Sequence, residues 1–180
     1  LCQTNVGDGI TMLDNLVRYL RAALPRMREE HSTLAQEVEL VQSYLAVLKI
    51  RMGTRLRYNV DIPSTLHDQP FPPMMLLTLA ENAIKHGLNP SSSGGSISIR
   101  AMALGDVLEI RVADSGVGFG AAATGGTGVG LANTRARLAA IHGAAAELNF
   151  LANEPHGVIA VIRVPLAPID ATAVPAGAAA

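Results

Sequence analysis

The chain has 180 residues, of which 49% are hydrophobic and 16% are charged; this predicts a packed globular protein and excludes a highly charged disordered chain. Its 14 Lys and Arg residues against 15 Asp and Glu residues give a net charge of −1, which excludes a broad basic field for nucleic acid or an anionic membrane. The single cysteine, Cys2, excludes an internal disulfide framework and a cysteine-based zinc cluster.

Two runs of heptad-like spacing occupy the first third of the chain, with apolar residues at alternating steps of three and four. Because Pro25 interrupts the first run, we predict a helix over residues 9–24 and a loop over 25–32. The second run predicts a helix over residues 34–52 that stops at Gly53. The two apolar seams are equally consistent with helices that cover the following domain and with a coiled-coil dimer face.

An alternation of period two begins at Arg55 and predicts a half-buried strand over residues 55–62, with a domain boundary near Gly53. A helix is predicted over residues 74–86, after a proline-rich segment, and is expected to end at Gly87.

Four more strands and one helix complete the predicted pattern. Residues 96–103 and 107–113 alternate on either side of Leu104-Gly105-Asp106, which predicts an antiparallel hairpin. A segment rich in glycine, alanine and threonine then opens a helix that runs to about His142. The last two strands are predicted over 146–151 and 158–164, and the tail after Pro168 is expected to be disordered.

The predicted helix over 74–86 is apolar except for one polar stripe, formed by Thr78, Glu81, Asn82, Lys85 and His86 at spacings of three and four residues. A buried carboxylate and amide need partners, because each costs about 1–3 kcal/mol if left unpaired. The stripe therefore faces solvent, caps neighbouring loops or binds a polar ligand, and the stripe alone favours a structural role.

Asp114 ends a predicted strand and begins the sequence Asp114-Ser115-Gly116-Val117-Gly118. It shares parity with Leu108, Ile110 and Val112, so its carboxylate is expected to point toward the core and to meet a donor there. Taken alone, the sequence is also typical of a simple Asp-Gly turn.

A glycine-rich run, Gly125-Gly126-Thr127-Gly128-Val129-Gly130-Leu131, precedes the helix that contains Asn133 and Arg135. Glycines let the backbone approach an anion closely, and a helix N-terminus offers free N–H groups, so this arrangement suits a phosphate. A flexible glycine linker is the alternative. The run is not a Walker loop, because neither Lys49 nor Lys85 follows a glycine.

Together and in this order, the three motifs resemble one family. Residues 81–87 are similar to the N-box, residues 114–118 to the first glycine box and residues 126–131 to the second glycine box of the GHKL ATP-binding domain, which gyrase B and sensor histidine kinases share. The two upstream helices resemble the dimerisation region of LytS/YehU-type histidine kinases, through Leu16-Val17-Arg18-Tyr19-Leu20, Leu34, Glu37, Tyr44-Leu45 and Arg51.

The resemblance implies an α/β fold: a two-layer sandwich of a mixed β-sheet with helices on one face, preceded by two helices of a dimerisation region. It implies domains over 1–53 and 54–167 and a tail over 168–180. It implies ATP and Mg²⁺ as cofactors, with Asn82 as the metal ligand. By the same resemblance Glu81 is the acid, base or positioning carboxylate, and Lys85 and His86 lie near the phosphates. Asp114 accepts from the adenine amino group, and both glycine boxes line the nucleotide: Gly116, Gly118, Thr127, Gly128, Val129, Gly130 and Leu131.

Two features depart from the family pattern. Gly157-Val158 stands where the last strand usually opens with Gly-Thr, so a hydroxyl that helps order the adenine site is missing. The phosphoacceptor motif His-Phe-Leu-Phe-Asn is also missing, and none of His31, His67, His142 and His156 has its context. Family spacing places the acceptor shortly before Leu1, so we expect this sequence to be a piece of a longer protein.

The function implied is transfer of the ATP γ-phosphate to a histidine outside this sequence, for relay to a response-regulator aspartate. Two alternatives are a GHKL kinase of protein serine, as in anti-sigma factors, and a nucleotide-gated dimerisation module without catalysis. A homodimer through the N-terminal helices, no nucleic acid partner and a cytoplasmic location in an inner-membrane sensor are expected, with membrane contact only through segments absent from this sequence.

Overall fold

The structure, a computed structural model, describes residues 6–26, 29, 31–119 and 129–167. Five strands form one sheet in the order β2-β4-β5-β7-β6: β2 Leu56–Asp61, β4 Gly95–Leu104, β5 Val107–Asp114, β7 Val158–Pro165 and β6 Glu147–Ala152. β2 runs parallel to β4 and the other neighbours are antiparallel, so the sheet is mixed. The predicted strands agree with these bounds to within a residue or two.

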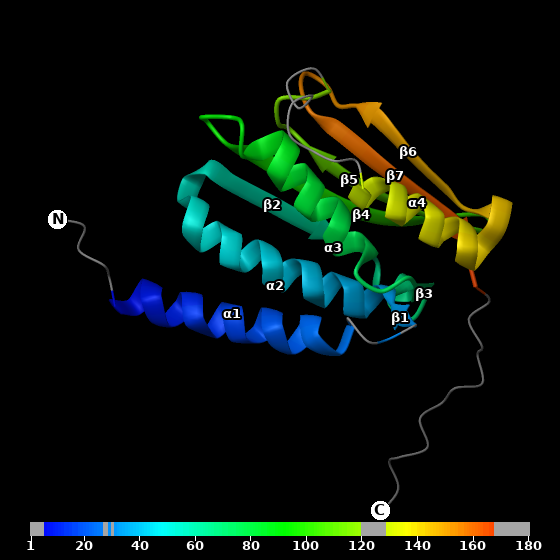
Figure 1. Cartoon of the computed structure of the whole chain (residues 1–180), viewed down its shortest axis with the longest axis horizontal. Helices are drawn as coiled ribbons and strands as arrows, with labels where there is room; N and C mark the ends of the chain where they lie inside the picture. The colour runs from blue at the N-terminus through cyan, green and yellow to red at the C-terminus, as the bar shows by residue number, and fades with distance from the viewer. Residues whose placement is uncertain (1–5, 27–28, 30, 120–128, 168–180) are drawn as a thin grey trace, which may run out of the picture.

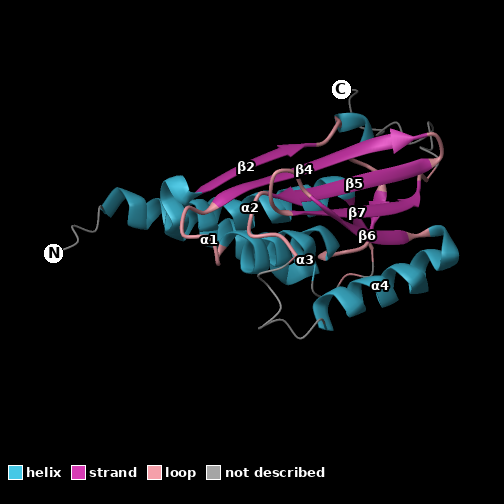
Figure 2. Ribbon diagram, turned by 90° about the horizontal axis from the view of Figure 1, so that it is seen from above, coloured by secondary structure: helices cyan, strands magenta, loops and turns pink. Residues whose placement is uncertain are grey.

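The main helices lie on one face of this sheet, which confirms the predicted α/β two-layer architecture (Figure 2). They are α1 Val6–Arg26, α2 Leu34–Met52, α3 Met75–Asn82 and α4 Val129–His142. Short strands β1 Ser32–Thr33 and β3 Pro70–Phe71 pair with each other beside the start of α2. Short 3₁₀ turns occupy Gly53–Arg55, Ser64–Leu66 and Gly143–Ala145. No helix among the described residues is long and apolar enough to cross a membrane.

The hairpin of β4 and β5 forms as predicted, with Leu104 paired to Val107 across a Gly105-Asp106 loop. Gly105 has φ +65°, a conformation that most side chains disfavour and that tight hairpin turns require. The hairpin carries Asp114 to the end of β5, where the candidate site lies.

The core lies between the sheet and helices α2 and α3. Leu108, Ile110 and Val112 of β5 are buried in one cluster with Leu45 of α2 and Leu76 of α3. The second predicted helix therefore shares its core with the sheet, and its end at Gly53 is as expected, with φ +59° at that glycine.

α1 runs beside α2 on the side away from α3 (Figure 1). On its inner side Ala23 is buried against Leu40 and Leu77, and Tyr19 and Ala22 pack against the same cluster. Its outer face exposes a row of large apolar side chains, Ile10, Leu13, Val17, Leu20 and Leu24, and Met12 and Leu16 are exposed as well.

Two predicted helix ends differ from the structure. The first helix continues through Pro25 to Arg26, because a proline one residue before the end removes only one backbone hydrogen bond. The predicted loop over 25–32 is correspondingly shorter, since Ser32 already belongs to β1. The helix of the polar stripe does not end at Gly87 either, because α3 passes directly into a π-helical turn, Ala83–Leu88.

Candidate functional site

The polar stripe of α3 is divided between solvent and the interior. Glu81 and Lys85 are exposed, whereas Asn82 and His86 are half-buried. The carboxylate of the stripe therefore faces solvent, and its amide is the more buried of the two groups.

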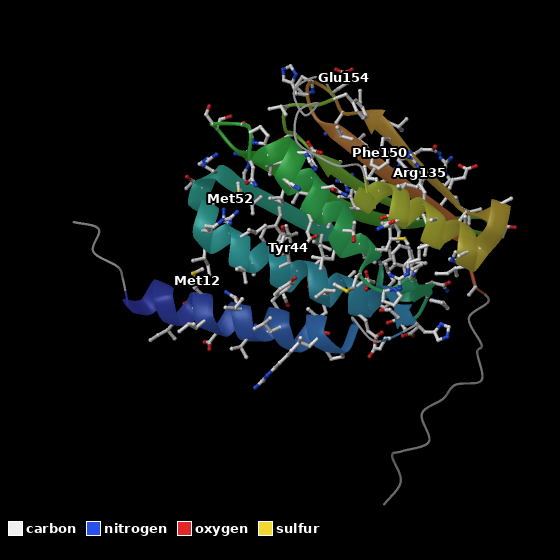
Figure 3. All side chains as sticks on the ribbon, in the orientation of Figure 1. Met12, Tyr44, Met52, Arg135, Phe150 and Glu154 are labelled. Carbon is white, nitrogen blue, oxygen red and sulfur yellow. The ribbon has the colours of Figure 1, made fainter. Side chains whose placement is uncertain are left out.

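Partial burial nevertheless raises the pKa of Glu81 above its usual value. Tyr44 of α2, labelled in Figure 3, has its pKa raised to about 12, first by burial and then by the negative charge of Glu81. The rings of Tyr44 and Tyr19 of α1 have their centroids 6.0 Å apart. Glu81 therefore lies near a tyrosine of each of the two N-terminal helices.

The π-helical turn Ala83–Leu88 connects Asn82 of α3 to Gly87, whose backbone contacts Asp114 of β5. The turn ends with a hydrogen bond that spans five residues, as is typical of a π-helix: the Asn89 N–H donates to the Ile84 carbonyl at 2.8 Å. Turns of this kind are frequent at functional sites because they rotate the following residues away from the regular helical path. Here the turn carries the backbone from Asn82 to Gly87, which lies against β5.

Asp114 is 4% exposed, so the carboxylate points inward as its parity predicted. Its Oδ1 accepts a hydrogen bond from the Gly116 N–H at 2.9 Å. Burial raises the pKa of Asp114, and hydrogen bonds from the backbone N–H groups of Gly116 and Val158 partly oppose that rise. The group is thus a buried acceptor held at the end of β5.

Three glycines allow the backbone to approach Asp114 and its neighbours. A Cβ at Gly87 would lie 2.5 Å from Asp114 Oδ1, and a Cβ at Gly116 would lie 2.2 Å from the Gly87 carbonyl carbon. A Cβ at Gly157 would lie 1.9 Å from the Asp114 carbonyl oxygen. The Val117 N–H also donates to the Gly87 carbonyl at 3.1 Å. The N-box and the first glycine box are therefore in direct contact.

Asn153, in the loop between β6 and β7, also supports the site. Its Nδ2 donates to the Asp114 carbonyl at 2.7 Å, and its backbone N–H donates to the Gly157 carbonyl at 3.1 Å. It thereby fixes the backbone that carries Asp114. No motif surrounds Asn153, and its partner lies 39 residues earlier, so local sequence carries no signal for this contact.

Asn82 Nδ2 is buried and has no hydrogen-bond partner among the described residues. Such an atom costs about 1–3 kcal/mol unless something satisfies it. A phosphate oxygen would accept from this donor, and the same amide offers its Oδ1 to a hard cation. Within the described part of the chain no three His, Cys, Asp or Glu residues gather as a metal cage. Mg²⁺ commonly takes one or two protein ligands plus phosphates, so Asn82 fits that group.

The second glycine box is only partly described. Thr127 and Gly128 lie outside the described residues, as does most of the segment between the glycine boxes. Val129 and Gly130 begin α4, and Leu131 packs against the main core. One turn further along α4, the guanidinium of Arg135 lies over the ring of Phe150 of β6, 5.6 Å from the ring centroid; both residues are labelled in Figure 3.

Comparison with known proteins places this geometry in a family. Residues 67–168 match the family described as Histidine kinase-, DNA gyrase B-, and HSP90-like ATPase, and residues 2–56 match the family described as Histidine kinase. The chain is 30% identical over 157 residues to the sensor histidine kinase YesM of Bacillus subtilis, covering 86% of this chain and 27% of that protein. It is 32% identical over 108 residues to the sensor protein LytS of Oceanobacillus iheyensis, covering 60% of this chain and 18% of that protein.

Solved structures agree on the fold. The catalytic domain of the histidine kinase ThkA superposes with a TM-score of 0.57 at 19% identity, over 77% of this chain and 97% of that chain. ThkA in complex with the response regulator TrrA gives a TM-score of 0.54 at 16% identity, over 92% and 53% of the two chains. The chain therefore belongs to the family of histidine kinase-, DNA gyrase B- and HSP90-like ATPases, and it is homologous to the catalytic portion of sensor histidine kinases of the YesM and LytS kind.

Proposed function

We propose that this chain binds ATP with Mg²⁺ and transfers the γ-phosphate to a histidine outside the chain, for relay to a response-regulator aspartate. The chain spans 27% of YesM and 18% of LytS, so the acceptor, the sensor and the regulator belong to the longer protein and its partners. The observation that carries the proposal is the π-helical turn, which joins a buried unsatisfied amide at Asn82 to the buried carboxylate of Asp114.

Asp114 is suited to recognise adenine. A buried carboxylate that remains ionised offers only acceptors, so it matches the exocyclic amino group and rejects a base that presents a carbonyl there. Gly116 and Gly118 follow it directly and leave the backbone free of side chains next to the base. Val158 supplies a backbone N–H to the same carboxylate, so the Gly157-Val158 sequence retains a donor although it lacks the hydroxyl.

Asn82 is suited to the phosphates and their metal. Its amide would satisfy its buried Nδ2 on a phosphate oxygen, or bind Mg²⁺ through Oδ1. Bound Mg²⁺ supplies charge neutralisation of the triphosphate. Lys85 and His86, on the next turn, and the second glycine box Thr127, Gly128, Val129, Gly130 and Leu131 are proposed to surround the phosphates.

Glu81 is proposed to act on the incoming histidine. In the transfer, the acceptor nitrogen forms a bond to the γ-phosphorus, the bond to the bridging oxygen breaks, and ADP leaves with that electron pair. A carboxylate whose pKa is raised by partial burial is a better proton acceptor, or a better positioning partner, for the imidazole N–H. Glu81 lies near Tyr19 of α1 and Tyr44 of α2, in the helical region.

The exposed apolar row of α1 is proposed as the homodimer face of the longer protein. It presents Ile10, Leu13, Val17, Leu20 and Leu24 at heptad-like spacing, and each of these side chains is at least 43% exposed. We assign residues 1–53 to the dimerisation region, 54–167 to the ATP-binding domain and 168–180 to a tail that lies outside the described residues. A response regulator partner, as seen with ThkA, and a cytoplasmic position in a membrane-bound sensor complete the proposal.

Equilibrium binding tests the nucleotide part. The chain should bind ADP and ATP, more tightly with Mg²⁺ than with EDTA, and should discriminate against GTP because Asp114 selects an amino group. Wild-type protein that shows no affinity for either adenine nucleotide at millimolar concentration would overturn the proposal.

A further inference from the structure

The N-terminus of α3 has no capping side chain of its own. Pro72 and Pro73 precede it, and Met74, at the N-cap position, has φ +60° and a side chain with no strong acceptor. The first backbone N–H groups of a helix are normally satisfied by a Ser, Thr, Asp or Asn at that position. Here their partner comes from a different helix.

Glu37 of α2 supplies the cap. It is 0% exposed; its Oε1 accepts from the Met74 N–H at 2.7 Å and its Oε2 from the Leu76 N–H at 3.1 Å. A carboxylate at this end also interacts favourably with the positive end of the helix dipole. A local cap would close the helix equally well, but only a cap from α2 fixes α3 relative to α2.

The same segment is held from its other side by α4. Arg137 Nη1 donates to the Pro73 carbonyl at 2.8 Å. The peptide group between Pro73 and Met74 is therefore bound at its N–H by a carboxylate from α2 and at its carbonyl by a guanidinium from α4. We call residues 73–76, with their two charged partners, the α3 junction. It connects the helix of the dimerisation region, the N-box helix and the helix that follows the second glycine box.

We propose that Glu37, although it lies in the helical region, is a positioning residue of the nucleotide site, acting through α3 and together with Arg137. The proposal rests on the function proposed above. α3 is short, Met75–Asn82, and at about 1.5 Å per residue its first turn lies only about 10 Å from Asn82. A shift at the junction would therefore move the Asn82 amide and the Gly87 backbone against which Asp114 packs.

A matched pair of variants on α2 tests this in the 180-residue chain. Glu37→Gln removes the charge and turns one acceptor into a donor facing an N–H group, whereas Glu39→Gln changes an exposed carboxylate two residues away. Glu37→Gln should raise the Kd for Mg-ADP about 2- to 30-fold, the range for residues that act on a site without touching its ligand. It should also speed hydrogen exchange across residues 75–82. Glu39→Gln should do neither.

Arg137 gives an independent test, because its side chain is exposed and its replacement spares the core. Arg137→Gln should weaken Mg-ADP binding while Arg137→Lys, which keeps a charged donor, restores most of it. In the double variant Glu37→Gln/Arg137→Gln, the fold-increase in the Kd for Mg-ADP should be smaller than the product of the fold-increases in the two single variants. The reason is that both residues act on one junction.

The outcomes separate the two proposals. A wild-type chain that does not bind Mg-ADP contradicts the proposed function itself. Suppose instead that the wild-type chain binds Mg-ADP and that Glu37→Gln is less stable but, when folded, binds Mg-ADP with the same affinity. That result overturns the positioning role and leaves Glu37 as a structural cap. If Glu37→Gln does not fold, unchanged affinity in Arg137→Gln overturns the role instead.

Discussion

The backbone of Gly87 lies directly against the carboxylate of Asp114, so closely that a Cβ on Gly87 would lie 2.5 Å from Oδ1 and 2.8 Å from Cγ. The contact joins the end of the π-helical turn to the end of β5, two segments that belong to different motifs in the sequence. It explains why glycine is needed at a position where the backbone φ is not positive. The space that the missing side chain leaves is occupied by the proposed adenine-binding group.

Gly87→Ala should therefore displace Asp114 and weaken ATP binding, because the added methyl cannot fit without moving a buried carboxylate. The expected loss is at least tenfold in affinity by calorimetry, with a lower melting temperature as well. Gly9→Ala is the control, since a Cβ there meets nothing within 4 Å. Equal ATP affinity in Gly87→Ala and Gly9→Ala would mean that the Gly87–Asp114 contact has no part in nucleotide binding.

Asp114→Asn should weaken adenine-nucleotide binding while the fold stays intact. The amide oxygen can still accept from the Gly116 N–H, but the new amide group presents a donor to the adenine amine. The mismatch should cost about 1–3 kcal/mol. Asp106→Asn, in the exposed hairpin loop, is the matched control, and unchanged ATP affinity for Asp114→Asn would remove this residue from the site.

Asn82→Ala should reduce the effect of Mg²⁺ on nucleotide affinity more than it reduces adenosine binding. The reason is that the proposed partners of the amide are the phosphates and the metal, not the base. Titrations of ADP and adenosine, each with Mg²⁺ or EDTA, measure this, with the exposed Asn89→Ala as control. An equal loss for adenosine and ADP would show that the amide has a packing role.

Glu109 gives a prediction about stability on the open face of the sheet. It is 0% exposed because Arg111 and Arg163 cover it, with distances of 2.6 Å and 2.7 Å from their Nε atoms to its carboxylate. Burial alone would raise the pKa of Glu109, but the hydrogen bonds and charges of the two arginines outweigh it and lower the pKa. The ionised carboxylate is therefore favoured in the folded state.

A lowered pKa contributes stability above the unfolded value, near 4.5, which is lost as the pH falls through the folded value. Glu109→Gln should therefore lower the free energy of unfolding by about 1–3 kcal/mol at pH 7. The difference from wild type should shrink as the pH is lowered below 4.5. Glu147→Gln, which changes a more exposed carboxylate 3.6 Å from Arg163, should have a small effect. If Glu109→Gln differs from wild type by the same free energy of unfolding at pH 7 and at pH 3, ionised Glu109 does not stabilise the fold.

Local sequence predicted the features that depend on periodicity. The parity of Leu108, Ile110 and Val112 correctly placed Asp114 on the buried face, and the Gly105 turn correctly joined β4 to β5. Gly53 ended α2 as expected, because a positive φ at a helix end is a local requirement that glycine meets.

The errors and omissions involve contacts between distant residues. The sequence predicts a helix stop at Gly87, but glycine is required there by the approach of Asp114 from β5. Glu37 caps a helix 37 residues away, and Glu109 binds an arginine 54 residues away. Asn153 supports the Asp114 backbone in the same way. None of these pairings leaves a local pattern, because each is created by the packing of elements that the sequence predicts only separately.

Phosphotransfer is the most direct test of the central claim. A longer version of the protein that includes the histidine expected upstream of Leu1 should incorporate γ-phosphate from labelled ATP. The label should be acid-labile and should disappear when that histidine is replaced or when Asn82 is changed to Ala. The 180-residue chain alone should bind ATP and remain unlabelled. Acid-stable label on serine, ATP binding without any transfer, or labelling of the chain alone at His31, His67, His142 or His156 would contradict the account.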